Sequence, residues 1–294
     1  KDAPWGDYND QILGLEVQKG ITSVSGFGYC RNLREVSLPE GLISLGKSVF
    51  LSCAQIQEIR LPKSLKTLGD GALAGCSSLT EIELPEGLEM IGSYALASCD
   101  FTSVVIPASV TEMGFAVFDC DYNLKTVEIK GNVLCLRKPF NDCAALQEVL
   151  ITGGVETIEE RAFYNLNSLE RVQIAGGLKT IGKLAFWSCD KITTVSLPDG
   201  VTSIGESAFE YCVNLTTINL PDSITTIGKD AFYRTKLTGP LNIPSSLVSL
   251  GDNAFHGCGG ITGTLLFPGA LENISKNAFA GCTGVEEIIL PRGV

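Results

Sequence analysis

The chain has 294 residues and a net charge of −11, and 45% of its residues are hydrophobic. This charge argues against a nucleic-acid partner and an anionic membrane surface, because both attract clustered Lys and Arg. No run approaches the roughly 20 apolar residues of a membrane-spanning helix. Residues 1–8 lack the apolar run of a signal peptide, so any export signal is expected to lie outside this chain.

The first stretch, residues 1–14, does not follow the pattern that organises the rest of the chain. It carries two large aromatic residues, Trp5 and Tyr8, which would be able to cover the first coil of a repeat structure. We therefore predict an N-terminal lead-in or cap at residues 1–14. A single elongated repeat domain is predicted for residues 15–294.

From residue 15 onward the chain repeats one unit of about 23 residues. A complete copy is Pro198–Leu220, PDGVTSIGESAFEYCVNLTTINL. Its tail alternates apolar and polar residues, which is typical of a short strand with one buried face. A unit this short cannot bury its own apolar face, whereas stacked units can. The sequence predicts an α/β repeat solenoid of about 12–13 coils with a parallel β-sheet.

Three positions inside the unit have predicted structural roles. Gly205 and its equivalents suit a turn that needs an unusual backbone angle. The Ala-Phe pair is predicted to form a short helical turn on the face opposite the sheet. The large residue at the position of Phe209 recurs in every coil, with Leu73 and Leu96 as substitutes, and predicts a stacked spine.

Ten of the eleven cysteines are assigned to one slot of the unit, namely Cys30, Cys53, Cys76, Cys99, Cys120, Cys143, Cys189, Cys212, Cys258 and Cys282. Leu166 and Thr235 fill this slot in other coils, which indicates a small buried position where free Cys packs as a hydrophobe. Parallel side chains about 4.8 Å apart suit neither disulfide geometry nor four converging zinc ligands. We predict buried free thiols, with a few disulfides as the alternative, and no metal site.

Catalysis finds little support in the sequence. His256 is the sole histidine, so a Ser-His-Asp triad would have to centre on it. It follows Phe255 at a position where the unit varies freely, which favours an ordinary surface histidine. Phosphate-binding and dinucleotide-binding glycine motifs and the CxxC motif are all missing. We predict no enzyme activity and no cofactor.

Two surfaces are candidates for binding. Outward positions of the strand tails form a strip that is acidic in the first half of the chain, at Glu58, Glu81, Glu83 and Glu128, and small and neutral further on, at Thr217 and Asn219. Repeat proteins often bind through such a strip. A line of aromatic residues just after the spine is the second candidate, at Tyr164, Trp187, Tyr211 and Tyr233, because Tyr and Trp are enriched in binding hot spots. A merely solvated sheet face and partial packing between coils are the plain alternatives.

The repeat LPDGVTSIGESAFEYCVNLTTINLP closely resembles the BspA-like leucine-rich repeat, through its Ile-Gly-x-x-Ala-Phe-x-x-Cys run and its proline-closed strand. The Leu-Thr-Gly-x-Leu variant at Leu237–Leu241 also resembles this family, and the likeness covers nearly the full chain. The coils at residues 131–143 and 153–166 depart from the pattern. The resemblance implies a right-handed solenoid with its strands on the concave face. It also implies a bacterial protein that is extracellular or attached to the cell surface.

We therefore expect a non-catalytic protein that binds a host matrix or cell-surface protein, or a glycan, as some adhesins of this family do. A stalk or spacer within a larger surface protein, without a dedicated ligand face, is the alternative. The sequence ends directly after a strand, which leads us to expect that the native protein continues or that something covers this edge.

Overall fold

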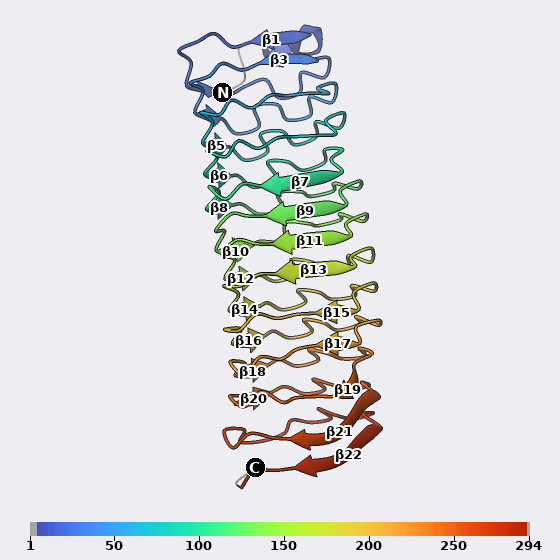
Figure 1. The fold of residues 1–294 in the computed structure, drawn as a ribbon. Helices are drawn as coiled ribbons and strands as arrows, with labels where there is room; N and C mark the ends of the chain where they lie inside the picture. Colours follow the sequence, from blue (N-terminus) through green and yellow to red (C-terminus); the bar gives the residue numbers. More distant parts are fainter. Residues whose placement is uncertain (1–4, 293–294) are drawn as a thin grey trace. The chain divides into compact units, whose positions relative to one another are not determined.

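The computed structural model describes residues 5–292, so residues 1–4 of the predicted lead-in and the last two residues of the chain lie outside the described range. The chain forms two compact units, Lys1–Val149 and Leu150–Val294. Each unit is a parallel β-solenoid in which consecutive coils follow one another in sequence order (Figure 1). Within the described residues, no helix is long and apolar enough to cross a membrane. The single domain over residues 15–294, the hand of the coil and its curvature stay predictions.

Each unit carries two rows of strands, whereas the sequence predicted one strand per coil. The predicted tail strands in the first unit are β1 (Gly14–Glu16), β3 (Glu35–Ser37), β7 (Ser103–Ile106) and β9 (Thr126–Ile129), and β11 (Glu148–Ile151) spans the unit boundary. Those of the second unit are β13 (Arg171–Ile174), β15 (Thr194–Val195), β17 (Thr217–Ile218), β19 (Thr238–Pro240), β21 (Gly260–Leu266) and β22 (Gly284–Ile289). Burial alternates as predicted along β7, β9, β11 and β13. The predicted tail strands at residues 58–61 and 81–84 do not form, and β22 does not alternate.

The second row consists of two-residue strands that end just before the glycine position. In the first unit they are β2 (Ser23–Val24), β4 (Ser44–Leu45), β5 (Thr67–Leu68), β6 (Met90–Ile91), β8 (Glu112–Met113) and β10 (Cys135–Leu136). In the second unit they are β12 (Thr157–Ile158), β14 (Thr180–Ile181), β16 (Ser203–Ile204), β18 (Thr226–Ile227) and β20 (Ser249–Leu250). All pairs are parallel, and β14 pairs with β16 through Thr180 opposite Ser203 and Ile181 opposite Ile204. Figure 1 shows both rows. The second row keeps the register of the repeat from β12 to β20, whereas the pair β21–β22 of the tail row shifts register between Gly263 and Thr264.

The predicted short helical turns around the spine are wrong. The one helix among the described residues is the 3₁₀ helix η1 (Gly6–Gln11). Around Phe209, the residues two before and two after have left-handed backbones, with φ of 53° at Ser207 and 60° at Tyr211. The N–H groups of these three residues point to the next coil and donate to its carbonyls at 2.8, 2.8 and 3.0 Å. Only the N–H groups between them, of Ala208 and Glu210, bond within the segment, to Gly205 and Ser207 at 3.3 and 3.2 Å. The segment is therefore a run of single turns, whereas in a helix consecutive N–H groups would bond within the segment.

The glycine at the position of Gly205 is required for a different reason than predicted. Its equivalents are Gly46, Gly69, Gly92, Gly114, Gly182, Gly228 and Gly251, and we call the set the contact glycines. Each of them lies outside the left-handed φ region, so no unusual backbone angle is involved. A Cβ at Gly205 would lie 2.6 Å from the carbonyl carbon of Gly182 and 2.7 Å from the nitrogen of Lys183. The contact glycines let adjacent backbones approach closely.

The predicted spine is confirmed. In the second unit Phe163, Phe186, Phe209, Phe232 and Phe255 are fully buried. Their ring centres are 4.7, 5.0, 5.3 and 5.0 Å apart, and neighbouring planes are within 10° of parallel. Leucine fills the same buried position at Leu73 and Leu96. Stacked rings and aliphatic substitutes both exclude water from the axis of each unit, which is where the hydrophobic burial is concentrated.

The thiols are free, and eight of the eleven are buried, as predicted for this slot. Cys212 is representative, because its Sγ donates to the carbonyl of Phe186 in the preceding coil at 3.0 Å. Burial raises the pKa of Cys212 to about 12. Cys282 is half-buried, and so is Cys135, which lies outside the slot.

The assignment of Cys120 to the slot is wrong by one residue. The slot lies three residues after the spine, and after Phe118 this position is Asp121, which is fully buried. Cys120 is half-buried and has a left-handed φ of 59°, as does the corresponding residue of other coils.

The lead-in covers the first coil through one of the two predicted aromatic residues. The ring of Trp5 stacks on Phe27 with 4.5 Å between centres, and its Nε1 donates to the carbonyl of Gly26 at 2.7 Å. Tyr8 is 59% exposed and does not act as a cover.

Candidate binding surfaces

The predicted line of aromatic residues exists in the second unit and is longer than expected. Tyr164, Trp187, Tyr233 and His256 each directly follow a spine phenylalanine, and Tyr211 follows one by two residues. We call these five residues the aromatic ladder. The main chain fixes their spacing, because the N–H of Tyr211 donates to the carbonyl of Tyr233 at 3.0 Å. All five side chains are half-buried.

The rings of the aromatic ladder contact one another without a gap. Tyr164 and Trp187 stack at 4.9 Å with planes 10° apart, and Tyr233 and His256 stack at 5.0 Å with planes 21° apart. Tyr211 lies between these pairs and is perpendicular to both neighbours, at 84° and 5.8 Å from each. Stacked and edge-to-face pairs are the favourable arrangements of aromatic rings. Much of the ring-face area is therefore used inside the ladder.

Two arginines accompany the ladder. The guanidinium of Arg161 lies 5.6 Å from the ring centre of Tyr164, and that of Arg234 lies 5.4 Å from the ring centre of Tyr233. Both distances suit a cation–π contact. The ladder is thus a mixed aromatic and cationic surface in a protein with a net charge of −11.

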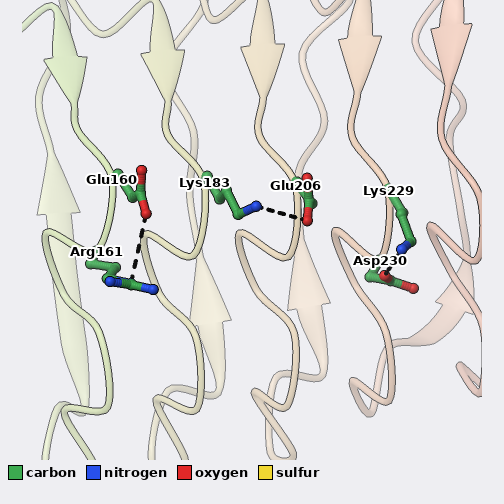
Figure 2. A network of polar contacts seen from close by, with 6 residues as sticks. All are labelled: Glu160, Arg161, Lys183, Glu206, Lys229 and Asp230. Atoms are coloured by element: carbon green, nitrogen blue, oxygen red, sulfur yellow. Dashed lines mark hydrogen bonds and ion pairs between the residues drawn. The ribbon is translucent and has the colours of Figure 1, made fainter.

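A row of charges of alternating sign runs near the ladder, at the position that follows the contact glycine. Its members in the second unit are Glu160, Lys183, Glu206, Lys229, Asp252 and Lys276. Figure 2 shows that Lys183 pairs with Glu206 of the next coil, at 3.0 Å. Lys229 pairs with Asp230 at 3.6 Å, and Glu160 pairs with Arg161 at 3.7 Å (Figure 2). Exposed pairs of this kind contribute little stability each. One of the three joins two members of the row, and the other two join a member to its chain neighbour.

Three residues of the predicted acidic strip, Glu58, Glu81 and Glu83, are exposed in segments of the first unit that form no strand, and Glu128 is half-buried on β9. Two of these carboxylates are paired, because Glu58 lies 2.7 Å from the Nε of Arg60 and Glu128 lies 3.6 Å from the Nζ of Lys130. Glu81 and Glu83 make no ion pair with any described residue. The strip is therefore less negative than its sequence suggests.

Part of this strip borders an open groove of about 710 Å³ at the start of the first unit. Strands β1 and β3 line it, together with Glu58 and Arg60, so both charge signs are present. A second hollow of about 390 Å³ lies beside β6 and β8 and is lined in part by Met90, Leu134 and Cys135.

The two neutral candidates differ in their surroundings. Thr217 is exposed on β17. Asn219 is committed to the main chain, because its Oδ1 accepts from the N–H of Leu197 at 2.6 Å and its Nδ2 donates to the carbonyl of Leu197 at 2.8 Å. The side chain of Asn219 thus links two adjacent coils through the main chain of Leu197, and both of its polar groups are used in this link.

In the described part of the chain, one group of acidic and thiol side chains comes close together, in turns of the first unit. Oxygen and sulfur atoms of Asp119, Cys120 and Asp142 lie within 4.8 Å of one another. The Nδ2 of Asn141 donates to Asp119 at 2.6 Å and to Asp142 at 3.0 Å. An amide thus already bridges the two carboxylates, and exposed acidic groups are common without an ion, so we assign no metal site.

Sequence reasoning missed His256, Arg161 and Arg234 as members of the aromatic surface. The signal for His256 was present, because it occupies the same position after the spine as Trp187 and Tyr233. Histidine was considered for catalysis, and its ring as a stacking partner was overlooked. Nδ1 of His256 is buried and has no hydrogen-bond partner among the described residues.

Comparisons with known proteins agree with this architecture. The family model of the BspA type leucine-rich repeat region matches residues 8–133, 135–262 and 259–294. A leucine-rich repeat protein from Bacteroides ovatus is 24% identical with a TM-score of 0.71, over 97% of this chain and 82% of that chain. The T. pallidum leucine-rich repeat protein is 26% identical with a TM-score of 0.53, over 58% of this chain and 82% of its own. No curated protein matches. The family model covers most of the sequence, and the chain therefore belongs to the BspA type leucine-rich repeat family.

Proposed function

We propose that this protein is a non-catalytic, extracellular or cell-surface protein that binds another protein through the aromatic ladder. Membership of a leucine-rich repeat family supports a binding role, and the family resemblance supports the location. The observation that carries the proposal is the unbroken contact of five half-buried rings at the variable position after the spine. Aromatic residues and arginine dominate the energetic centres of protein interfaces.

A protein partner fits the ladder better than a glycan does. A sugar stacks on an open ring face, but Trp187 stacks on Tyr164, and Tyr233 stacks on His256. Arg161 further occupies the surroundings of the Tyr164 ring. The ladder therefore offers ring edges, hydroxyl groups and two guanidinium groups, which suit a protein surface with carboxylates and carbonyls.

The experiment is a screen of the purified protein against matrix proteins and a glycan array, followed by substitution. Trp187→Ala and Tyr211→Ala should each weaken the Kd for the identified protein about 30-fold, the roughly 2 kcal/mol of a hot-spot residue. Tyr94→Ala is the matched control, because it removes an exposed tyrosine from an aromatic pair in the first unit. Unchanged circular dichroism would show that each variant is folded.

Reversal of charge at Glu58, Glu81 and Glu83 tests the competing surface. Loss of binding in this variant alone would move the site to the acidic strip of the first unit, and binding to glycans alone would contradict a protein partner.

A spacer without a ligand face is the second candidate, favoured by charges that pair between adjacent coils, such as Lys66 with Glu89 at 2.9 Å. Failure to bind any protein or glycan in the screen would support the spacer, whereas binding that survives all of these substitutions would contradict both site assignments.

A further inference from the structure

Asp121 is an exception within the cysteine slot of the repeat. In the described coils this slot holds cysteine, Leu166, Thr235 or Asp121, and Asp121 is the one residue among them with a carboxyl group. Its side chain is fully buried. A buried carboxylate is costly unless it is paired with a cation or fully hydrogen-bonded, so its contacts decide its charge.

The neighbouring thiols show what the slot requires. Cys99 in the preceding coil donates its S–H to the carbonyl of Leu73 at 3.3 Å, and Cys143 in the following coil donates to the carbonyl of Phe118 at 3.0 Å. In both cases the acceptor is the spine residue of the coil before. In both coils that flank Asp121, the slot side chain thus carries a proton and gives it to a main-chain carbonyl, whereas Leu166 fills the slot elsewhere without a donor.

As a carboxylate, Asp121 would have only one of its two oxygens hydrogen-bonded. Its Oδ1 accepts a hydrogen bond from the N–H of Cys99 at 2.6 Å. Its Oδ2 is buried and has no partner among the described residues. By analogy with the thiols, the acceptor that belongs to this position is the carbonyl of Leu96, the spine residue of the preceding coil. An ionised Oδ2 cannot donate to a carbonyl.

The charged and titratable groups around Asp121 disfavour ionisation. They are Cys99 and Asp100 in the preceding coil, Asp119 and Cys120 in its own coil and Cys143 in the following coil, and none of them is a cation. Burial, with smaller contributions from Asp119 and Asp100, raises the pKa of Asp121 to about 8, although the N–H of Cys99 opposes this shift.

We propose that Asp121 is uncharged in the folded protein and donates its Oδ2 proton to the carbonyl of Leu96, and that loss of this proton to solvent loosens the coil and exposes Cys99 and Cys143. This makes one coil of the first unit sensitive to pH across the neutral range. The thiol coils have no such sensitivity there, because burial raises the pKa of Cys76 and Cys212 well above neutrality.

The direction of the pH effect follows from linkage. The pKa of Asp121 is about 8 in the folded protein, against 3.8 for an ordinary exposed aspartate, and the lower value applies to the unfolded chain. Below the unfolded pKa both states hold the proton, and its stabilising effect is complete. Between these two pKa values the unfolded chain binds fewer protons, so the ratio of folded to unfolded protein falls by up to about tenfold for each pH unit. The contribution is lost as the pH passes the folded pKa.

The matched variant is Asp121→Asn, whose amide keeps the acceptor for Cys99 and supplies an N–H donor at every pH. Asp199→Asn is the control, because it makes the same substitution in an exposed turn. Thiol labelling of the full chain, read peptide by peptide in a mass spectrometer, gives the rate at Cys99 and Cys143 relative to Cys212. This ratio removes the general rise in thiolate with pH.

We expect the ratio to rise at least about tenfold between pH 6 and pH 9 in the wild type and in Asp199→Asn, and to stay flat in Asp121→Asn. The same rise in Asp121→Asn would overturn the proposal. Infrared difference spectra give a readout that does not depend on folding of the variant. A protonated carboxyl band at pH 6.5 that disappears near pH 8, and is missing in Asp121→Asn or Asp121→Cys, supports the proposal. A wild type without this band refutes it.

Discussion

Substitution of the contact glycine Gly205 by alanine tests whether adjacent coils approach as closely as described. The new Cβ would lie 2.6 and 2.9 Å from the carbonyl carbon and oxygen of Gly182 and 2.7 Å from the nitrogen of Lys183. Ordinary contact begins near 3.4 Å, so the two backbones must separate by about 0.8 Å. This movement stretches the 2.8 Å hydrogen bond from the N–H of Gly205 to the carbonyl of Ile181. Overpacking and a weakened hydrogen bond together cost about 2–4 kcal/mol.

Two other glycines of the same unit separate this effect from backbone conformation. Gly200 has a φ of +100° and no atom within 4 Å of its Cβ position, so Gly200→Ala should cost about 1–2 kcal/mol through backbone strain alone. Gly176 has neither a left-handed φ nor a close neighbour. Gly176→Ala should leave stability unchanged or raise it by about 0.4–1 kcal/mol.

The assay is urea unfolding monitored by the fluorescence of Trp187, which lies in the same unit as all three glycines. The expected order of stability is Gly176→Ala, then Gly200→Ala, then Gly205→Ala. If Gly205→Ala proves as stable as Gly176→Ala, the neighbouring backbones do not approach as closely as described, and the explanation of the contact glycines is refuted.

Two further predictions concern the core. In the same urea titration, Phe209→Ala should lower the free energy of unfolding by about 3–5 kcal/mol. Phe209→Leu should lower it by less than about 1.5 kcal/mol, because leucine fills this position in two other coils. Equal losses of stability would show that the volume of the side chain at this position does not matter. Native-state thiol labelling at pH 8 should modify the half-exposed Cys120, Cys135 and Cys282 first. Uniform labelling of all cysteines would contradict the burial described.

Repeated spacing predicted most of the core, because a residue type that recurs about every 23 positions must stack on its own copies. This logic places the phenylalanine spine, the tail strands and the buried thiols. It failed at Cys120, which lies two residues after Phe118, whereas Asp121 lies at the three-residue spacing of the slot. The cysteine itself suggested position 120 for the slot, whereas the count of three residues from Phe118 gives position 121.

The turns around the spine could not be predicted from residue types. Their left-handed positions hold Ser207, Tyr211 and Leu184 as well as glycines, and local preference gives no signal for such a backbone. Hydrogen bonds to the next coil impose this conformation. The two-residue strands were missed for a related reason, because a pair such as Thr180–Ile181 is too short to show alternation.

The binding surface, too, could be predicted from the sequence only in part. Four aromatic residues at similar positions were sufficient to predict a line of rings. Their orientation could not be predicted: Tyr211 lies two residues after the spine, unlike Trp187 and Tyr233, and its ring is perpendicular to both. Whether any partner uses this surface stays a prediction.

The hydrogen bonds of the turn segments give each unit a direction. The N–H groups of Phe186, Phe209 and Phe232 donate to the following coil, and the carbonyls of Ala208 and Ala231 accept from the preceding one. Two such surfaces match only when donors of one meet acceptors of the other. A two-fold symmetric contact through these surfaces would place donors against donors, so assembly along this axis could proceed head to tail but would not close into a symmetric pair. The same directionality would let a duplicated coil insert at any position of the stack without altering the bonding of its neighbours.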